Sequence, residues 1–189
     1  MRSALAPSPS DHTSPYYTYN YKVSYFEQVN HYVDLPIPEI FTWFNENLRD
    51  ELREYFKSFY RITNIWLYET PCDVIGNNFT LNSKWHVDDD VFGSLKVIMY
   101  LSNVTATSGP FAYEDPLRKI KLGIVGEAGT TVLFESSKIL HSATNVIDTA
   151  RYAISFLIIP YPGNKDVCSF SNTMPFNTSA LKNPLELEV

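Results

Sequence analysis

The sequence lacks several features that define large classes of proteins. Only two cysteines are present, Cys72 and Cys168, and they have no metal-ligand spacing. This excludes a zinc site built from cysteines and a disulfide-rich scaffold, so we expect free thiols in a reducing compartment, with a single disulfide as the alternative. Basic residues are outnumbered, 15 Lys and Arg against 21 Asp and Glu, and they form no run. We therefore expect no nucleic-acid partner.

Long apolar runs are also missing. No segment approaches the length of a membrane-spanning helix. Residues 1–15 are rich in Ser and Pro and contain no apolar core of the kind that a signal peptide has. We therefore expect a cytoplasmic protein with no membrane partner. No pattern in the sequence indicates an oligomeric state.

The composition that remains is that of a globular domain. The chain has 189 residues, of which 44% are hydrophobic and 15% aromatic, enough for a single domain with its own core. We expect a mobile tail over residues 1–15, because so polar a segment cannot offset the entropy of ordering by burial. One domain is expected over residues 16–160, followed by a C-terminal extension over 161–189 that wraps it.

Side-chain periodicity predicts a mainly β protein. Alternation with a period of two is clear in residues 16–26, where tyrosines alternate with polar residues, and in residues 94–104. In the second segment Leu95, Val97 and Met99 should share one face, and Lys96, Ile98 and Tyr100 the other. Further short strands are predicted at 62–69, 111–113, 120–125, 130–135, 142–146 and 151–159.

One helix is predicted, over residues 41–59. Its apolar residues recur at a spacing of three and four, which is typical of an amphipathic helix packed on a sheet. Many short strands and a single early helix favour an antiparallel double-sheet jelly roll, the double-stranded β-helix of cupin-like proteins, with an N-terminal bracing helix.

The residues Trp85 to Asp90 contain a candidate metal-binding motif. On a strand, His86 and Asp88 point to the same side because they are two residues apart. One more histidine would complete the two-histidine, one-carboxylate set that binds non-haem Fe(II) and leaves positions open. The alternative is an ordinary polar strand end that leads into an acidic turn.

Two residues farther along the chain fit such a site. His12 lies in the tail and His31 near an early turn, so His141, just after a predicted strand, is the candidate third ligand. Its alternative role is a hydrogen-bonded histidine at a strand end. Ten residues later Arg151 opens an apolar strand, where a buried guanidinium needs an anion. A ligand carboxylate could supply it, or a salt bridge to Asp148 or Glu135.

With these four residues in this order, residues 62–160 resemble the Fe(II)/2-oxoglutarate-dependent dioxygenase superfamily. Residues 95–104 with Ser108 to Phe111 resemble its phytanoyl-CoA dioxygenase-type branch, and residues 151–156 equally resemble prolyl-4-hydroxylase-type members. The resemblance implies that His86, Asp88 and His141 hold Fe(II) and that Arg151 binds the distal carboxylate of 2-oxoglutarate. It also implies O2 as co-reactant and hydroxylation of a small-molecule or peptidyl substrate, with release of succinate and CO2.

Other site residues are weaker candidates. By the same resemblance, Tyr100 would lie beside the cosubstrate, with plain core packing as the alternative, and Tyr68 and Lys96 are possible further contacts. Asp90 would share the face of Asp88 and could orient a ligand by hydrogen bonding, whereas Asp89 should point away. Two other functions stay open, a jelly-roll binding module without turnover and a cupin-like metal enzyme that does not use 2-oxoglutarate.

Overall fold

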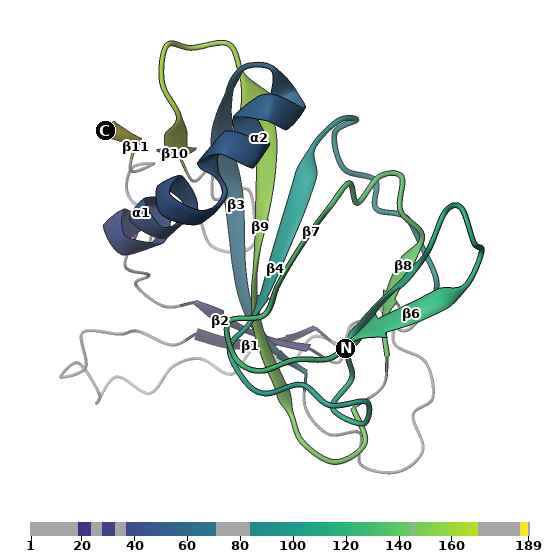
Figure 1. Cartoon of the computed structure of the whole chain (residues 1–189). Helices are drawn as coiled ribbons and strands as arrows, with labels where there is room; N and C mark the ends of the chain where they lie inside the picture. The colour runs from purple at the N-terminus through teal and green to yellow at the C-terminus, as the bar shows by residue number, and fades with distance from the viewer. Residues whose placement is uncertain are drawn as a thin grey trace, which may run out of the picture.

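The computed structural model describes residues 19–23, 28–32, 37–70, 84–144, 146–169 and 186–188. This part of the chain is mainly β, as predicted, with two sheets and two helices (Figure 1). The strands are β1 (Tyr19–Val23), β2 (Gln28–Tyr32), β3 (Phe59–Thr70), β4 (Leu95–Tyr100), β5 (Phe111–Glu114), β6 (Lys121–Ile124), β7 (Thr131–Phe134), β8 (His141–Ala143), β9 (Arg151–Tyr161), β10 (Val167–Ser169) and β11 (Glu186–Glu188). The helices are α1 (Ile37–Asn47) and α2 (Arg49–Phe56).

The strands form one large and one small sheet. The large sheet has the order β1-β2-β3-β9-β4-β7, with β10 pairing with β3 and β11 with β10. The small sheet has the order β6-β5-β8. The longest pairing, β3 with β9, runs from Phe59 opposite Tyr161 to Thr70 opposite Arg151. This register puts Arg151 at the end of β9 that lies far from the helices in Figure 1.

The helices cover one face of the large sheet. Phe44 and Leu52 are fully buried there, and the ring of Phe44 packs edge-on against Phe156 of β9, with centroids 4.9 Å apart. The same core cluster contains Leu95 and Val97 of β4. The apolar helix stripe that the sequence shows is therefore explained by packing on the sheet.

The prediction of one helix over residues 41–59 was wrong in two respects. The helix is kinked at Leu48, whose φ of −133° is not helical, although the hydrogen bonds from Leu48 N to Phe44 O and from Leu52 N to Leu48 O both persist at 2.9 Å. It also ends at Phe56, because Lys57 takes a left-handed φ of 52° and Phe59 already begins β3. Buried Asp166 binds Arg49 and Arg53, so tertiary ion pairs help to set the direction of the second segment.

The faces predicted for residues 94–104 are confirmed, although the strand is shorter. Leu95, Val97 and Met99 belong to the cluster beneath the helices, whereas Ile98 and Tyr100 belong to a second cluster on the opposite face. Strands were found at each of the other predicted positions, with boundaries shifted by a few residues.

The remaining predictions concern the first strand, Cys72 and the division of the chain into tail, domain and extension. The predicted first strand is seen as β1, and its pairing with β2 was not predicted. Cys72 and the tail 1–15 lie outside the described residues. The division of the chain into tail, domain and extension stays a prediction. None of the described helices is long and apolar enough to cross a membrane.

Candidate metal centre

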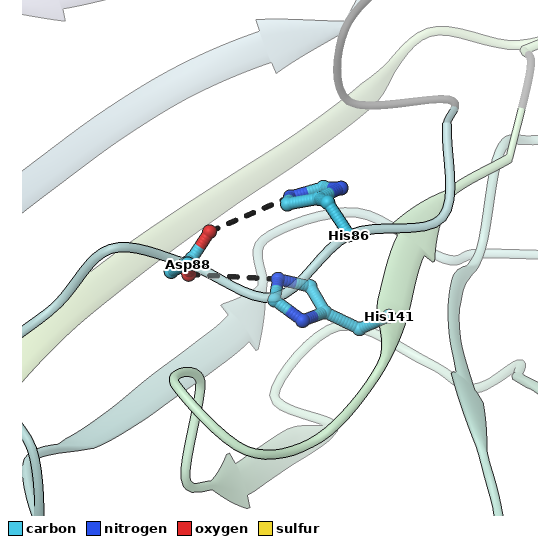
Figure 2. A group of neighbouring side chains, drawn as sticks. All are labelled: His86, Asp88 and His141. Carbon is cyan, nitrogen blue, oxygen red and sulfur yellow. Dashed lines mark ion pairs between the residues drawn. The ribbon is translucent and has the colours of Figure 1, made fainter.

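His86, Asp88 and His141 come together as predicted, although His141 is more than fifty residues from the other two in the sequence. Their potential ligand atoms all lie within 4.8 Å of one another, and Figure 2 shows the three side chains pointing toward a common centre. Backbone pairing brings them together, because His86 N donates to His141 O and His141 N donates to His86 O, each at 2.9 Å. The two imidazole ring centroids are consequently 4.5 Å apart.

The local backbone differs from the strand that the motif predicted. His86 forms a single isolated β-bridge beside β8, and Asp88 lies outside any strand, with its N–H donating to Ser136 O at 2.9 Å. These two long-range bonds, to His141 and Ser136, take the place of a regular strand pairing. The side chains of His86 and Asp88 still reach the same point. Asp89, the residue after Asp88, is exposed, which agrees with the prediction that it points away.

Backbone carbonyls fix the orientation of both histidines. Nδ1 of His86 lies 2.7 Å from Lys84 O, and Nδ1 of His141 lies 2.8 Å from Ile139 O. Because a carbonyl oxygen only accepts, each Nδ1 carries the hydrogen and each Nε2 is left to face Asp88. The Nε2 atoms are 3.4 and 3.5 Å from the carboxylate oxygens. This is the arrangement of two neutral nitrogen donors and one anionic oxygen donor that a divalent transition metal binds.

The electrostatics of the centre favour a cation between these groups. Hydrogen bonding to Asp88 raises the pKa of His86, and this effect outweighs the burial that would lower it. Burial alone would raise the pKa of Asp88, but hydrogen bonds from His141 and His86 and the charge of Lys96 hold that pKa well below its usual range. Asp88 is therefore an ionised carboxylate that draws a proton or a metal ion toward the two Nε2 atoms.

One side of the centre is closed by aromatic packing. The rings of Phe134 and Phe111 lie 5.0 and 5.6 Å from the ring of His141, whose side chain is only 7% exposed. The side chain of His86 is 32% exposed. An apolar cavity of about 640 Å³ adjoins the closed side and is lined in part by Phe111, Phe134 and Ile139. The centre therefore has one buried histidine, His141, and one histidine that solvent can reach, His86.

Arg151 is buried at the start of β9, as predicted, and is only 2% exposed. Its Nη1 donates to Gly109 O, its Nη2 donates to Thr70 Oγ1 at 3.1 Å, and its buried Nε has no hydrogen-bond partner. The guanidinium carbon lies 5.9 Å from the centroid of the Tyr68 ring. Neutral partners thus fix the orientation of the guanidinium without balancing its charge.

The salt bridge considered as an alternative for Arg151 is not formed. Asp148 accepts hydrogen bonds from Thr107 at 2.5 Å and from Ser108, and Glu135 is paired with Lys138 at 2.7 Å. Within the described residues no ion pair to Arg151 is found. A buried cation in this situation is costly unless an anion binds it, which makes Arg151 a candidate anion-binding residue.

The weaker candidates lie close to these two groups in different ways. Tyr100 is fully buried, and its hydroxyl already donates to Ile124 O at 2.8 Å and accepts from Phe111 N at 2.9 Å. Burial raises the pKa of Tyr100, so the hydroxyl stays protonated. Tyr68 stands next to Arg151, whereas Lys96 contacts Asp88 and not Arg151. Cosubstrate contacts of all three stay predictions.

Asp90 contacts no histidine of the centre. Its Oδ2 accepts from Ser136 Oγ at 2.5 Å and lies 3.3 Å from Lys96 Nζ, so Asp90 is linked to Asp88 through Lys96 and through Ser136, whose backbone O accepts from Asp88 N. Sequence reasoning missed Ser136, Thr70 and Gly109. Gly109 had a signal, the Ser-Gly-Pro turn, where its φ is +70° and a Cβ would lie 2.6 Å from a Val146 methyl. Ser136 and Thr70 carry no pattern that would have singled them out.

Comparisons with known proteins identify solved structures that share this fold. No family model and no curated protein matches this chain. HygX from Streptomyces hygroscopicus, crystallised with nickel, 2-oxoglutarate and hygromycin B, superposes with a TM-score of 0.53 at 14% identity, over 76% of this chain and 74% of HygX. EctD from S. alaskensis, crystallised with 2-oxoglutarate and 5-hydroxyectoine, has a TM-score of 0.52 at 16% identity, over 74% of this chain and 61% of EctD.

A third similar structure is the nickel complex of ThoJ, a non-heme monooxygenase. Its TM-score is 0.46 at 17% identity, and the match covers 60% of this chain and 49% of ThoJ. The chain therefore spans about half the length of ThoJ and roughly three quarters of HygX. At these identities the similarity to HygX and EctD shows a shared fold.

Proposed function

We propose that this protein is an Fe(II)- and 2-oxoglutarate-dependent oxygenase that hydroxylates a small-molecule or peptidyl substrate and releases succinate and CO2. The observation that carries the proposal is the convergence of His86, Asp88 and His141 within 4.8 Å, with buried Arg151 on the strand that follows. The fold shared with HygX, crystallised with nickel and 2-oxoglutarate, and with EctD, crystallised with 2-oxoglutarate, supports it.

We infer that the two sheets are the two faces of a double-stranded β-helix. One face would be β3-β9-β4-β7, and the other would be the His86 bridge followed by β8, β5 and β6. The chain passes repeatedly from one sheet to the other, as a jelly roll does. The phytanoyl-CoA-type and prolyl-4-hydroxylase-type resemblances both lie within these sheets, and neither branch is favoured. Residues 16–160 would form the oxygenase domain.

Each of the three ligand residues has a distinct role in this proposal. His141 would be the rigid ligand, because Ile139 O fixes its Nδ1 and two aromatic rings pack against it. His86 would be the ligand nearest to solvent, and Asp88 the single anionic ligand. Three ligands on one side of a metal leave the other positions for cosubstrate and oxygen, and iron bound there would supply the activation of O2. Asp88 would take the coordination position that a halide needs, so its presence favours hydroxylation over halogenation.

Arg151 would hold the distal carboxylate of 2-oxoglutarate. Gly109 O and Thr70 Oγ1 use one hydrogen from each Nη, which leaves Nε–H and the remaining Nη hydrogens for an anion. A guanidinium can bind a carboxylate through two parallel hydrogen bonds. Tyr68 would flank that carboxylate, and Tyr100, whose hydroxyl is already bonded to the backbone, would contribute a wall.

The proposal is tested by anaerobic titration of the protein with Fe(II) and then 2-oxoglutarate. We expect the weak visible charge-transfer band of the metal chelate, and its absence in folded wild-type protein would overturn the proposal. Succinate formation over a panel of small molecules and peptides would then identify the substrate. Binding of both without any succinate release would favour a non-catalytic module, and turnover insensitive to N-oxalylglycine would favour a cupin-like enzyme without 2-oxoglutarate.

A further inference from the structure

A lysine side chain reaches the candidate metal centre from the large sheet. Lys96 of β4 contacts Oδ2 of Asp88, and its Nζ lies 3.3 Å from Oδ2 of Asp90. Its side chain is only 18% exposed, and its Nζ lies 5.8 Å from the centroid of the Trp66 ring. Ser136 Oγ donates to the same oxygen of Asp90 at 2.5 Å. The ammonium is therefore held in place by two carboxylates, one of them fixed by a serine.

A cation in this position requires an explanation. Like charges repel strongly where burial lowers the effective dielectric constant, so an ammonium beside a metal-binding carboxylate opposes binding of the metal. For metal affinity alone, a neutral hydrogen-bond donor beside Asp88 would be more favourable than an ammonium. The contacts suggest what the ammonium contributes instead, because it touches one oxygen of Asp88 and leaves the other. Oδ1 faces Nε2 of His86 at 3.4 Å and accepts no hydrogen bond from Lys96, whereas Oδ2, which holds the ammonium, lies 3.5 Å from Nε2 of His141.

We propose that Lys96 is a positioning residue that makes Asp88 a ligand through one oxygen only. This inference rests on the function proposed above. Lys96 binds Oδ2, so Oδ1 is the atom offered to the metal, and the position that a second oxygen would occupy stays open for 2-oxoglutarate. Asp90 holds the ammonium and is itself fixed by Ser136 Oγ, so Asp90 acts on Asp88 through Lys96. Lys96 is then not a cosubstrate ligand, contrary to its assignment from the sequence resemblance.

The charges of the assembled site agree with this role. Lys96 and Arg151 together balance the two carboxylates of Asp88 and Asp90, and a divalent metal balances the two charges of 2-oxoglutarate. The complete site is therefore neutral. Without Lys96 it would carry a net negative charge in a partly buried location, which disfavours the dianionic cosubstrate more than the metal.

The test uses Co(II), which reports its coordination through its visible absorption, in wild-type protein and in Lys96→Met, Lys96→Arg, Asp90→Asn and Lys138→Met. Lys138→Met is the matched control, because it removes an ammonium paired with Glu135 in a half-exposed position. Each protein is titrated with Co(II) alone and then with 2-oxoglutarate. Circular dichroism and thermal unfolding establish that each variant is folded.

We expect Lys96→Met to bind Co(II) at least as tightly as wild type, since a repulsive charge is removed. Its Co(II)-only spectrum should differ, because both oxygens of Asp88 can then approach the metal. Its affinity for 2-oxoglutarate should fall by about tenfold or more, because the second oxygen of Asp88 would compete for the open position and the site would carry one more negative charge. Lys96→Arg should restore the wild-type spectrum, Asp90→Asn should show a smaller change in the same direction, and Lys138→Met should match wild type.

Three outcomes would overturn the inference, and they are distinguishable. A wild-type Co(II)-only spectrum with weakened 2-oxoglutarate binding in Lys96→Met would make Lys96 a cosubstrate ligand. Wild-type behaviour in both titrations would make the lysine contact merely structural. If Lys96→Met does not fold, Asp90→Asn decides, and unchanged 2-oxoglutarate affinity there would contradict the inference. Failure of wild-type protein to bind Co(II) and 2-oxoglutarate would instead contradict the proposed function itself.

Discussion

The two faces of β4 lead into regions of different character. Leu95, Val97 and Met99 point to the helices, where every neighbour in the core cluster is hydrophobic. Lys96 and Tyr100 point to the other side, toward Asp88 and a backbone carbonyl. In the first region, which we call the helix face, the hydrophobic side chains are accommodated by packing against one another. The second, the site face, contains charged groups, namely Lys96 held by two carboxylates and Arg151, which has no ion pair within the described residues.

This contrast shows where stability and function are separated in the molecule. Burial of hydrophobic side chains stabilises the helix face roughly in proportion to area, whereas a buried charge on the site face costs free energy until a ligand binds. Substitutions on the helix face should therefore lower the free energy of unfolding and leave binding intact. Substitutions on the site face should weaken ligand binding and leave the free energy of unfolding unchanged or higher.

The largest effect on stability is expected for Phe44→Ala. Phe44 is fully buried and packs on Phe156, so its removal should lower the free energy of unfolding by about 4 kcal/mol through lost burial and a cavity. Denaturant titration measures this, and metal affinity per folded molecule should not change. Phe92→Ala, at a ring that is 78% exposed, is the control and should cost about 0.5 kcal/mol or less. A small loss of stability in Phe44→Ala, or an equal loss in Phe92→Ala, would contradict the assignment of stability to the helix face.

The next effect is expected for Arg151→Met on the site face. Affinity for 2-oxoglutarate should fall by about a hundredfold, because hydrogen bonds to a charged group are worth roughly 1.5–3 kcal/mol each. Binding of the metal alone should survive. The thermal midpoint without ligand should be unchanged or higher, since a buried cation without an ion pair is removed, and the increase caused by 2-oxoglutarate should disappear.

Calorimetry and thermal unfolding with and without 2-oxoglutarate check the Arg151 prediction. Arg118→Met is the control, because Arg118 is exposed and, among the residues that the structure describes, its side chain pairs with Asp115 alone, at 4.0 Å. Equal loss of metal and 2-oxoglutarate binding in Arg151→Met would show that Arg151 supports the structure rather than the cosubstrate.

A smaller effect is expected for Asp166→Asn, at the edge of the helix face. Asp166 is buried and accepts from Arg53 Nε at 2.9 Å and from the backbone N–H of Tyr60. Its neutralisation should lower the free energy of unfolding by about 2 kcal/mol, less than for a fully buried pair because the arginine remains partly hydrated. The exposed pair of Glu54 with Lys57 is the control, and Glu54→Gln should cost about 0.5 kcal/mol or less.

The smallest effect concerns Cys168, which is buried in the helix-face cluster. Burial raises the pKa of the Cys168 thiol to about 12. The folded state therefore keeps its proton while the unfolded state loses it above pH of about 8.5, so this contribution to stability is complete below that pH and is lost as pH rises toward 12. The free energy of unfolding should fall by roughly 1 kcal/mol per pH unit from this group between pH 9 and 10.

Denaturant titrations at pH 8, 9 and 10 measure that slope, which should be absent in Cys168→Ala. Alkylation provides a second measurement, since a buried neutral thiol should react at least about a hundredfold more slowly in the native protein than after unfolding. Mass spectrometry of the peptide that contains Cys168 reports the rate. Rapid native alkylation would show that the helix face is not closed around this residue.

Local pattern was enough to predict much of the fold and the identity of the central residues. The alternation in β4 correctly separated its two faces, because the period of a strand depends only on backbone geometry. His86, Asp88 and His141 were named from residue type and order, and their convergence was predicted correctly. The kink at Leu48 was not predictable, because apolar spacing continues across it and only contacts with distant residues distinguish the two helices.

The sequence by itself determined which residues could bind a metal and an anion, and which alternate side chains of β4 face the core. Tertiary structure alone decided how these groups are held. Arg151 is oriented by Thr70 and Gly109, 81 and 42 residues away, and Lys96 is directed to Asp88 rather than to Arg151. Such contacts join segments that meet only after folding, so no periodicity in the chain indicates them. The chemistry of each side chain is local, whereas its partner is a consequence of topology.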